Sequence, residues 1–253
     1  MFRKAIVKEP SKSMVYGIST ANLGVPDYQT ALEQHRQYKK ALEDYGLLVD
    51  VMEPDDNYPD SVFIEDTAVL TPEFAVITNP GHYKRQGEVF AVEKKLREIY
   101  SSMFYIKSPG TMDGGDVMKC NGHFIVGQSA RTNKEGIQQF REIVAGYGYE
   151  VSIVRLTSIL HLKTGVTCLG EKQVLISADL KDNPVFEGFK KILVPGDESY
   201  AANSLEVNGK ILIPKDFSKT RQLIEHSGFK TKSIDVSEFR KLDGGLTCLS
   251  LRI

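Results

Sequence analysis

The sequence has no excess of charge of one sign. Its 32 lysines and arginines are matched by 33 aspartates and glutamates, which gives a formal net charge of −1. Because proteins bind nucleic acid largely by placing a basic surplus on its phosphates, this balance predicts no nucleic-acid partner. A hydrophobic content of 41% and a charged content of 26% over 253 residues are typical of a globular protein, built as one large domain or two small ones.

Long hydrophobic runs are also lacking. No stretch approaches the roughly 20 apolar residues that cross a bilayer. The N-terminal segment has one basic pair, Arg3-Lys4, followed by a short strand-like run, without the apolar core of a secretory signal. We therefore expect a cytoplasmic protein that has no membrane partner.

Cysteines are few, and glycine-rich nucleotide motifs do not occur. Cys120, Cys168 and Cys248 are too scattered for a disulfide framework, and no pair has the spacing of metal ligands. We expect three reduced thiols and no metal site. The sequence contains no G-x-G-x-x-G or Walker pattern, which disfavours an open, doubly wound nucleotide-binding sheet.

What the sequence does contain is a unit that recurs five times: a small or acidic start, a short apolar strand, a turn and a second apolar strand. The copies begin at Glu65, Gly114, Thr164, Ala202 and Gly244. Two of them contain Asn-Gly, at Asn121-Gly122 and Asn208-Gly209, which is the strongest short-range signal for a hairpin. The fifth copy stops after one strand, and its missing partner is predicted to be the first strand, Arg3 to Lys8.

Between these hairpins lie stretches with apolar residues at helical spacing, each followed by another short strand. The expected helices are Asp27–Tyr45, Gln86–Tyr100, Asn133–Tyr147, Asn183–Lys191 and Ser218–Ser227, and the strands after them are Leu47–Met52, Met103–Ile106, Val151–Val154, Ile192–Val194 and Thr231–Ile234. Repeats that start roughly 40 to 50 residues apart indicate a closed or stacked architecture. We therefore predict one domain over residues 1–253, an α/β propeller of five pseudo-symmetric blades.

In such a ring, the starts of the hairpins should converge on the axis. They carry acidic residues, one histidine and one cysteine: Asp60, Glu65, Asp66, Asp113, Asp116, His161, Asp243 and Cys248. Because buried charges need partners, this many carboxylates predicts a cationic ligand. A guanidinium fits, since its planar N–H donors form two-point contacts with carboxylates.

Cysteine together with histidine and carboxylates is the equipment of covalent catalysis. A thiolate attacks an electrophilic carbon, and an imidazole transfers the protons. The structural alternative is that Cys248 is a small buried hydrophobic residue, as most unpaired cysteines are. Cys168, in TGVTCL, occupies the same repeat position as Cys248, in GGLTCL, so the repeat alone does not choose between them.

Six segments resemble motifs of the dimethylarginine dimethylaminohydrolase family, in the guanidine-modifying pentein superfamily. The resemblance runs over nearly the whole sequence and keeps the order and spacing of the motifs. The segments are PDSVFIEDTAVL (Pro59–Leu70), MDGGDVM (Met112–Met118), SARTNKEG (Ser129–Gly136), LHLKTG (Leu160–Gly165), ESYAAN (Glu198–Asn203) and KLDGGLTCLSLRI (Lys241–Ile253).

This resemblance implies the roles of individual residues. Cys248 would be the nucleophile, His161 the general acid and then base, and Asp113 the carboxylate that orients the guanidine and the histidine. The resemblance assigns Asp66 and Glu65 to the guanidine, and it assigns Arg85 and Arg131 to the α-carboxylate. Asp60 and the carbonyls of Ile18 and Leu242 would bind the α-amino group, with Asp243 beside them. Residues Ile18 to Gly24 would act as a lid. Ile18 stands where leucine is familiar, and Asp113 is within the family's pattern of aspartate or glutamate.

The implied partner is a small cationic amino acid, a methylated arginine, and the implied reaction needs no cofactor. It releases citrulline and methylamine or dimethylamine through a covalent thiouronium on the cysteine. Arginine deiminase and amidinotransferase of the same superfamily remain alternatives, as does a non-catalytic five-bladed binding protein. A monomer and a homodimer are both open.

Overall fold

The computed structural model describes residues 1–170 and 172–253, and over these residues it contains five three-stranded sheets. All five have one pattern: the middle strand pairs antiparallel with one neighbour and parallel with the other. A hairpin followed by a crossover to a third strand produces this pattern. The predicted unit of hairpin, helical stretch and strand is therefore confirmed, although the turn of the third hairpin, at residue 171, lies outside the described residues.

The chain forms two compact units, residues 1–65 with 204–253 and residues 66–203. The first unit contains two of the sheets and the second contains three. The expectation of a single domain stays a prediction.

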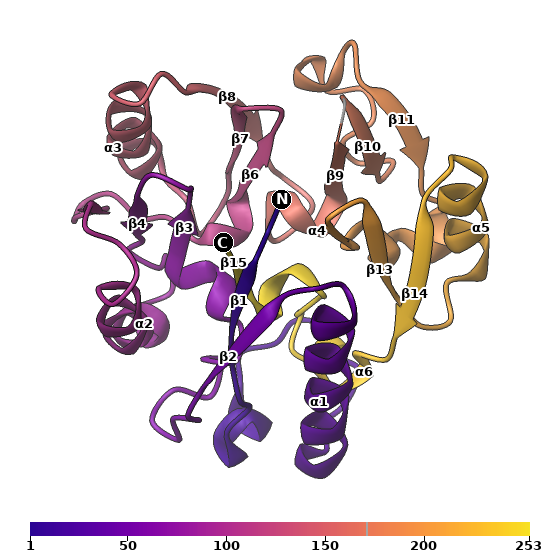
Figure 1. The fold of residues 1–253 in the computed structure, drawn as a ribbon, viewed down its shortest axis with the longest axis horizontal. Helices are drawn as coiled ribbons and strands as arrows, with labels where there is room; N and C mark the ends of the chain where they lie inside the picture. The colour runs from indigo at the N-terminus through magenta and orange to yellow at the C-terminus, as the bar shows by residue number, and fades with distance from the viewer. Residues whose placement is uncertain (171) are drawn as a thin grey trace. The chain divides into compact units, whose positions relative to one another are not determined.

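In the first unit, the two ends of the sequence share a sheet (Figure 1). Strand β1 lies between β2, to which it is parallel, and β15, to which it is antiparallel, with Ala5 opposite Arg252 and Ile6 opposite Leu251. This confirms the predicted partner of the fifth repeat. The elements of this sheet and the helices beside it are β1 (Lys4–Lys8), η1 (Lys12–Tyr16), α1 (Tyr28–Asp44), β2 (Leu48–Met52), α6 (Ser237–Arg240), η7 (Thr247–Leu249) and β15 (Leu251–Arg252).

The other sheet of the first unit is a hairpin with a helical crossover. Its elements are β12 (Leu205–Val207), β13 (Lys210–Pro214), α5 (Ser218–His226) and β14 (Lys230–Ile234). Asn208 and Gly209 have φ values of 53° and 83°, as a two-residue type I′ hairpin turn requires. The Asn-Gly prediction is confirmed here and at Asn121-Gly122 in the second unit, where φ is 51° and 80°.

The second unit repeats the pattern three times. Its strands are β3 (Ala68–Leu70), β4 (Ala75–Ile77), β5 (Met103–Tyr105), β6 (Val117–Cys120), β7 (His123–Gln128), β8 (Glu150–Arg155), β9 (Val166–Gly170), β10 (Gln173–Ile176) and β11 (Lys190–Leu193). Its helical segments are η3 (Tyr83–Glu88), α2 (Val89–Leu96), η4 (Gly114–Asp116), α3 (Lys134–Ala145), α4 (Leu162–Gly165), η5 (Pro184–Phe186) and η6 (Gly196–Ala202), and η2 (Ile64–Thr67) spans the start of the unit.

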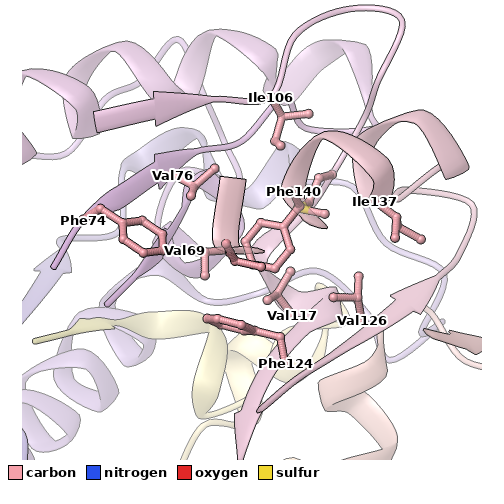
Figure 2. Packing of buried hydrophobic residues seen from close by; sticks show 11 residues of the cluster. Val69, Phe74, Val76, Ile106, Val117, Phe124, Val126, Ile137 and Phe140 are labelled. Carbon is pink, nitrogen blue, oxygen red and sulfur yellow. The ribbon is translucent and has the colours of Figure 1, made fainter. Parts of the chain in front are cut away.

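A hydrophobic core holds the first two of these sheets against α3 (Figure 2). Phe124 of β7 and Phe140 of α3 meet edge to face, with ring centroids 5.1 Å apart, and both are buried. Val117 and Val126, from facing strands of one hairpin, pack beside them. Alternate residues of β7 thus fill the core, and the first strand of each hairpin begins at the end that carries the acidic residues Asp66, Asp113 and Asp116.

Two expectations from the sequence are wrong. The stretch Asn183–Lys191 is no α-helix: it forms only the 3₁₀ turn η5 and then enters β11. Gly188 has φ +79°, which ends any helix there. Cys120 and Cys168 are not reduced thiols either, because they form a disulfide between β6 and β9, with Cα atoms 5.8 Å apart.

In the described part of the chain, no helix has both the length and the apolar character needed to cross a membrane.

Candidate active site

In the second unit, a buried carboxylate pairs with the predicted histidine. Asp113 stands just before η4 and is fully buried, and its Oδ2 lies 3.0 Å from Nε2 of His161. Its Oδ1 accepts a hydrogen bond from the backbone N–H of Gly81 at 2.8 Å. Both oxygens are therefore engaged, and the imidazole is fixed by a carboxylate that itself cannot rotate.

Asp66 belongs to the same buried cluster and is held by two donors. Its Oδ2 accepts from Nη1 of Arg85 at 2.5 Å, and its Oδ1 accepts from the backbone N–H of Gly115 at 2.9 Å. A Cβ on Gly115 would come within 2.8 Å of Asp66 Oδ1 and 3.0 Å of the His161 ring. Only glycine lets the backbone approach both side chains so closely.

The two arginines predicted to bind a carboxylate lie in the same cluster. Arg85 is buried, and its Nε and Nη2 also bond the carboxylate of Glu88. Arg131 is more accessible: its side chain is 15% exposed, and its Nη1 lies 3.7 Å from Oδ2 of Asp113. The structure therefore brings together five of the predicted residues, Asp66, Arg85, Asp113, Arg131 and His161.

The charges of this cluster shift the pKa values of His161 and Asp66. Burial alone would lower the pKa of His161, but attraction to Asp66 and Asp116 and the hydrogen bond with Asp113 outweigh it and raise the pKa to about 9. Burial would raise the pKa of Asp66, yet His161 and Arg85 bring it down to about 2. The imidazole is therefore a cation at neutral pH and can donate a proton.

Asp66 and Asp113 could also share a bound cation, and His161 would join them as a ligand only in its neutral form. Each offers an atom of ligand type, and these atoms lie within 4.8 Å of one another. Two of the three residues are carboxylates, and a planar guanidinium is a cation whose N–H donors suit carboxylates. The expectation that no metal is used stays a prediction.

In the first unit, Cys248 lies in the turn η7 just before β15. It is partly exposed and remains a thiol. The backbone N–H of Gly245 donates to its Sγ at 3.4 Å, and its own N–H donates to the carbonyl of Gly245 at 3.2 Å. This closed turn fixes the direction of the thiol.

The turn is anchored from helix α1 and from β15. The hydroxyl of Tyr38, which is buried, donates to the carbonyl of Leu246 at 2.9 Å and lies 2.7 Å from Oγ of Ser250. Arg252 donates to the carbonyl of Ser250 at 2.9 Å and to Oε1 of Glu65 at 3.0 Å. The predicted residue Glu65 is thus tied to the segment that carries the cysteine.

The predicted amine-binding groups also lie together in the first unit. Asp60 accepts from the backbone N–H of Ile18 at 3.0 Å. A Cβ on Gly17 would stand 3.0 Å from both Asp60 Oδ1 and the Leu242 side chain, so these groups surround one small space. Asp243 accepts from the N–H and hydroxyl of Thr20, at 2.6 and 3.0 Å, and so holds the expected lid segment.

Sequence reasoning missed Glu88, Arg252, Ser129 and Thr132, which support predicted residues. Glu88 follows Arg85 at a spacing of three, which places both on one face of a helical turn. That signal was present in the sequence. Ser129 accepts from Arg131 two positions along the chain, a local contact, whereas Thr132 and Arg252 contact Asp113 and Glu65 over separations of 19 and 187 residues.

Comparison with known proteins agrees with this geometry. The family model described as "N,N dimethylarginine dimethylhydrolase, eukaryotic" matches residues 26–248. The chain is 40% identical to the N(G),N(G)-dimethylarginine dimethylaminohydrolase of Pseudomonas aeruginosa over the full length of both, and 36% identical to the Streptomyces coelicolor protein of that name over 99% of this chain and 97% of the other.

A solved structure of the Pseudomonas aeruginosa enzyme, a cysteine-to-serine variant complexed with citrulline, matches with a TM-score of 0.98 over all of both chains. The five-bladed α/β propeller is thereby confirmed as the fold class. The chain belongs to the dimethylarginine dimethylaminohydrolase family.

Proposed function

We propose that the protein hydrolyses Nω-methylated arginines, monomethyl or asymmetric dimethyl, to citrulline and methylamine or dimethylamine. The observation that carries the proposal is the buried set of Asp66, Asp113 and His161 within 4.8 Å of one another, an anionic site with a proton donor. It has the charge for a guanidinium and the acid needed to release an amine from it. Membership of the family supports the same reaction.

The family resemblance supplies the substrate roles that we assign. Asp66 and Asp113, with Glu65, hold the guanidinium. Asp60 and the carbonyls of Ile18 and Leu242 hold the α-amino group, and Asp243 holds the segment that begins at Ile18. Arg85 and Arg131 bind the α-carboxylate, and Arg131 is the more accessible of the two.

In the first step, the thiolate of Cys248 attacks the guanidinium carbon. A C–S bond forms, and the π electrons move to nitrogen, which gives a tetrahedral adduct. His161, as imidazolium, gives its proton to the departing nitrogen. The C–N bond breaks, the amine leaves, and a planar thiouronium remains on the cysteine.

In the second step, His161, now neutral, takes a proton from water, and the water oxygen attacks the same carbon. The C–S bond then breaks and the new hydroxyl loses its proton to solvent, which returns the thiolate and releases the urea group of citrulline. One histidine thus serves as acid and then as base, and Asp113 keeps its ring in place for both. General acid–base help of this kind contributes about 10² to 10⁴ in rate.

Hydrolysis of unmethylated arginine is the rival within the superfamily, since the same groups would release ammonia. Citrulline formation from arginine, monomethylarginine and asymmetric dimethylarginine should be compared under identical conditions. We expect kcat/KM to be highest for a methylated arginine. A large preference for arginine would replace this proposal with a deiminase, and no citrulline from any of the three would favour a binding protein.

A further inference from the structure

Asp116 is a fully buried carboxylate with no part in the steps above. Its Oδ1 accepts from the backbone N–H of Leu162 at 2.9 Å, and its Oδ2 accepts from the hydroxyl of Ser129 at 2.6 Å. The hydroxyl of Thr132 is a further hydrogen-bond partner. Burial raises the pKa of Asp116 to about 6, although these hydrogen bonds and the nearby His161 lower it. Burying this carboxylate therefore costs free energy.

The partners of Asp116 each adjoin a residue of the site. Leu162 follows His161 directly. Ser129 accepts the backbone N–H groups of Arg131 and Thr132, at 2.9 and 3.1 Å, and so shapes the turn that carries Arg131. The Thr132 hydroxyl accepts the backbone N–H of Asp113 at 3.1 Å. One carboxylate therefore joins the three segments that carry Asp113, Arg131 and His161.

Both carboxylate oxygens of Asp116 must act as acceptors, because a hydrogen-bond donor faces each of them. An amide N–H, that of Leu162, faces one oxygen. Ser129 already accepts two N–H groups, so its remaining capacity is its own O–H, which must be donated to the other oxygen. An asparagine offers one acceptor and one donor, so it cannot satisfy both partners. This position therefore requires a carboxylate and not merely a polar side chain of the same size.

The backbone leaves space for this contact. A Cβ on Gly127, in β7, would stand 2.8 Å from Oδ1 of Asp116 and 3.0 Å from Cβ of Leu162. Gly127→Ala would therefore push on the Asp116–Leu162 contact without removing any polar group.

We propose that Asp116 is a positioning residue of the reaction, which sets His161 and Arg131 relative to Asp113 through Leu162, Ser129 and Thr132. It touches neither substrate nor reacting atoms. The expected effect of Asp116 on the reaction rate rests on the proposed function. Its expected effect on the position of His161 can be measured without any substrate.

The substrate-free arm compares crystal structures of the wild type, Asp116→Asn and Asp179→Asn. Asp179 is the matched control, because it also accepts hydroxyl hydrogen bonds, from Ser158 and Ser177, but is exposed. In Asp116→Asn we expect the 3.0 Å contact of His161 with Asp113 to be broken or displaced. The Asp179 variant should keep it. An unchanged His161–Asp113 pair in Asp116→Asn would overturn the proposal, whatever the substrate proves to be.

The kinetic arm separates the two branches of the network. Asp116→Asn and Gly127→Ala should lower kcat by about 10- to 100-fold, because small misplacement of a catalytic group has effects of that size. Ser129→Ala frees the turn of Arg131 and leaves the contact of Asp116 with Leu162 in place, so it should raise KM several-fold with little change in kcat, and Ser129→Thr should restore KM. A purely structural Asp116 predicts lower thermal stability with wild-type kcat and KM in the remaining folded protein, and that result would contradict a positioning role.

Discussion

The two units hold their predicted catalytic residues by different means. In the second unit, buried charges hold one another: Arg85 grips Asp66 and Glu88, and Asp113 holds His161. In the first unit, the segment around Cys248 is fixed mainly by neutral hydrogen bonds and close packing, with Tyr38 and the backbone of Gly245 as anchors. A charged cluster needs no flexibility to bind a cation, whereas a nucleophile needs one fixed direction and an accessible sulfur.

The largest effect should come from the nucleophile. Cys248→Ser should reduce citrulline formation from methylarginine by on the order of 10³-fold or more, since the step that forms the covalent intermediate is lost. Circular dichroism and thermal unfolding should stay close to wild type, because only one sulfur atom is exchanged. Wild-type turnover in this variant would remove Cys248 from the mechanism and leave the charged cluster as the whole of the chemistry.

The disulfide should affect mainly the second unit. Cys120 and Cys168 are 48 residues apart, and cross-linking a loop of that size stabilises by about 4 kcal/mol in the chain-entropy model. The double variant Cys120→Ala, Cys168→Ala should lose stability of that order in urea unfolding. Amide hydrogen exchange should rise in β6 and β9 more than in β1 and β15. Equal stability of the wild type with and without reductant would mean that the cross-link contributes nothing.

The packing of the first unit can be tested at one glycine. A Cβ on Gly244 would stand 2.2 Å from the Phe63 ring, so Gly244→Ala must displace that ring or the turn before Cys248. We expect a loss of about 1 to 3 kcal/mol in the free energy of unfolding, together with a lower kcat. Gly196→Ala is the matched control, because an added Cβ there meets no atom within 4 Å. Equal effects of the two variants would show that the close approach is unimportant.

The smallest effect should appear as a pH dependence of the charged cluster. The folded-state pKa of His161 is raised from 6.5 to about 9, so the imidazolium stabilises the fold fully below pH 6.5 and this contribution is lost as pH rises through 9. Turnover should fall about tenfold per unit above pH 9 as the general acid is lost. His161→Gln should lack the alkaline loss of stability. A wild-type stability that is flat from pH 6 to 10 would disagree with the raised pKa.

Local patterns in the sequence predicted the repeated parts of the fold well. The two Asn-Gly turns have the positive φ values that this dipeptide favours, and α1 begins at the cap that Asp27 provides. Asn183–Lys191 failed because a short apolar pattern does not distinguish a helix from a strand, and Gly188 decides the outcome.

The residues of the candidate site could be predicted from the sequence, but the contacts that support them were harder to predict. Hairpin starts and family motifs predicted the cluster of Asp66, Asp113 and His161. The Cys120–Cys168 disulfide depends on which strands become neighbours, which no spacing of two cysteines reveals. The part played by Asp116 depends on the donors that face it, from Leu162 and Ser129, and residue type alone does not show them.

The pairing of β1 with β15 has a consequence for how the protein is made. When a ribosome has just completed β1 and β2, only two strands of this three-stranded sheet exist. One edge of β1 then stays unpaired until β15 has been made. Pairings between such distant segments form slowly, and an open strand edge can pair with a wrong partner in the meantime. The segment that completes this sheet is also the one that delivers Cys248. A nascent chain therefore acquires Cys248, the proposed nucleophile, and the strand missing from this sheet together.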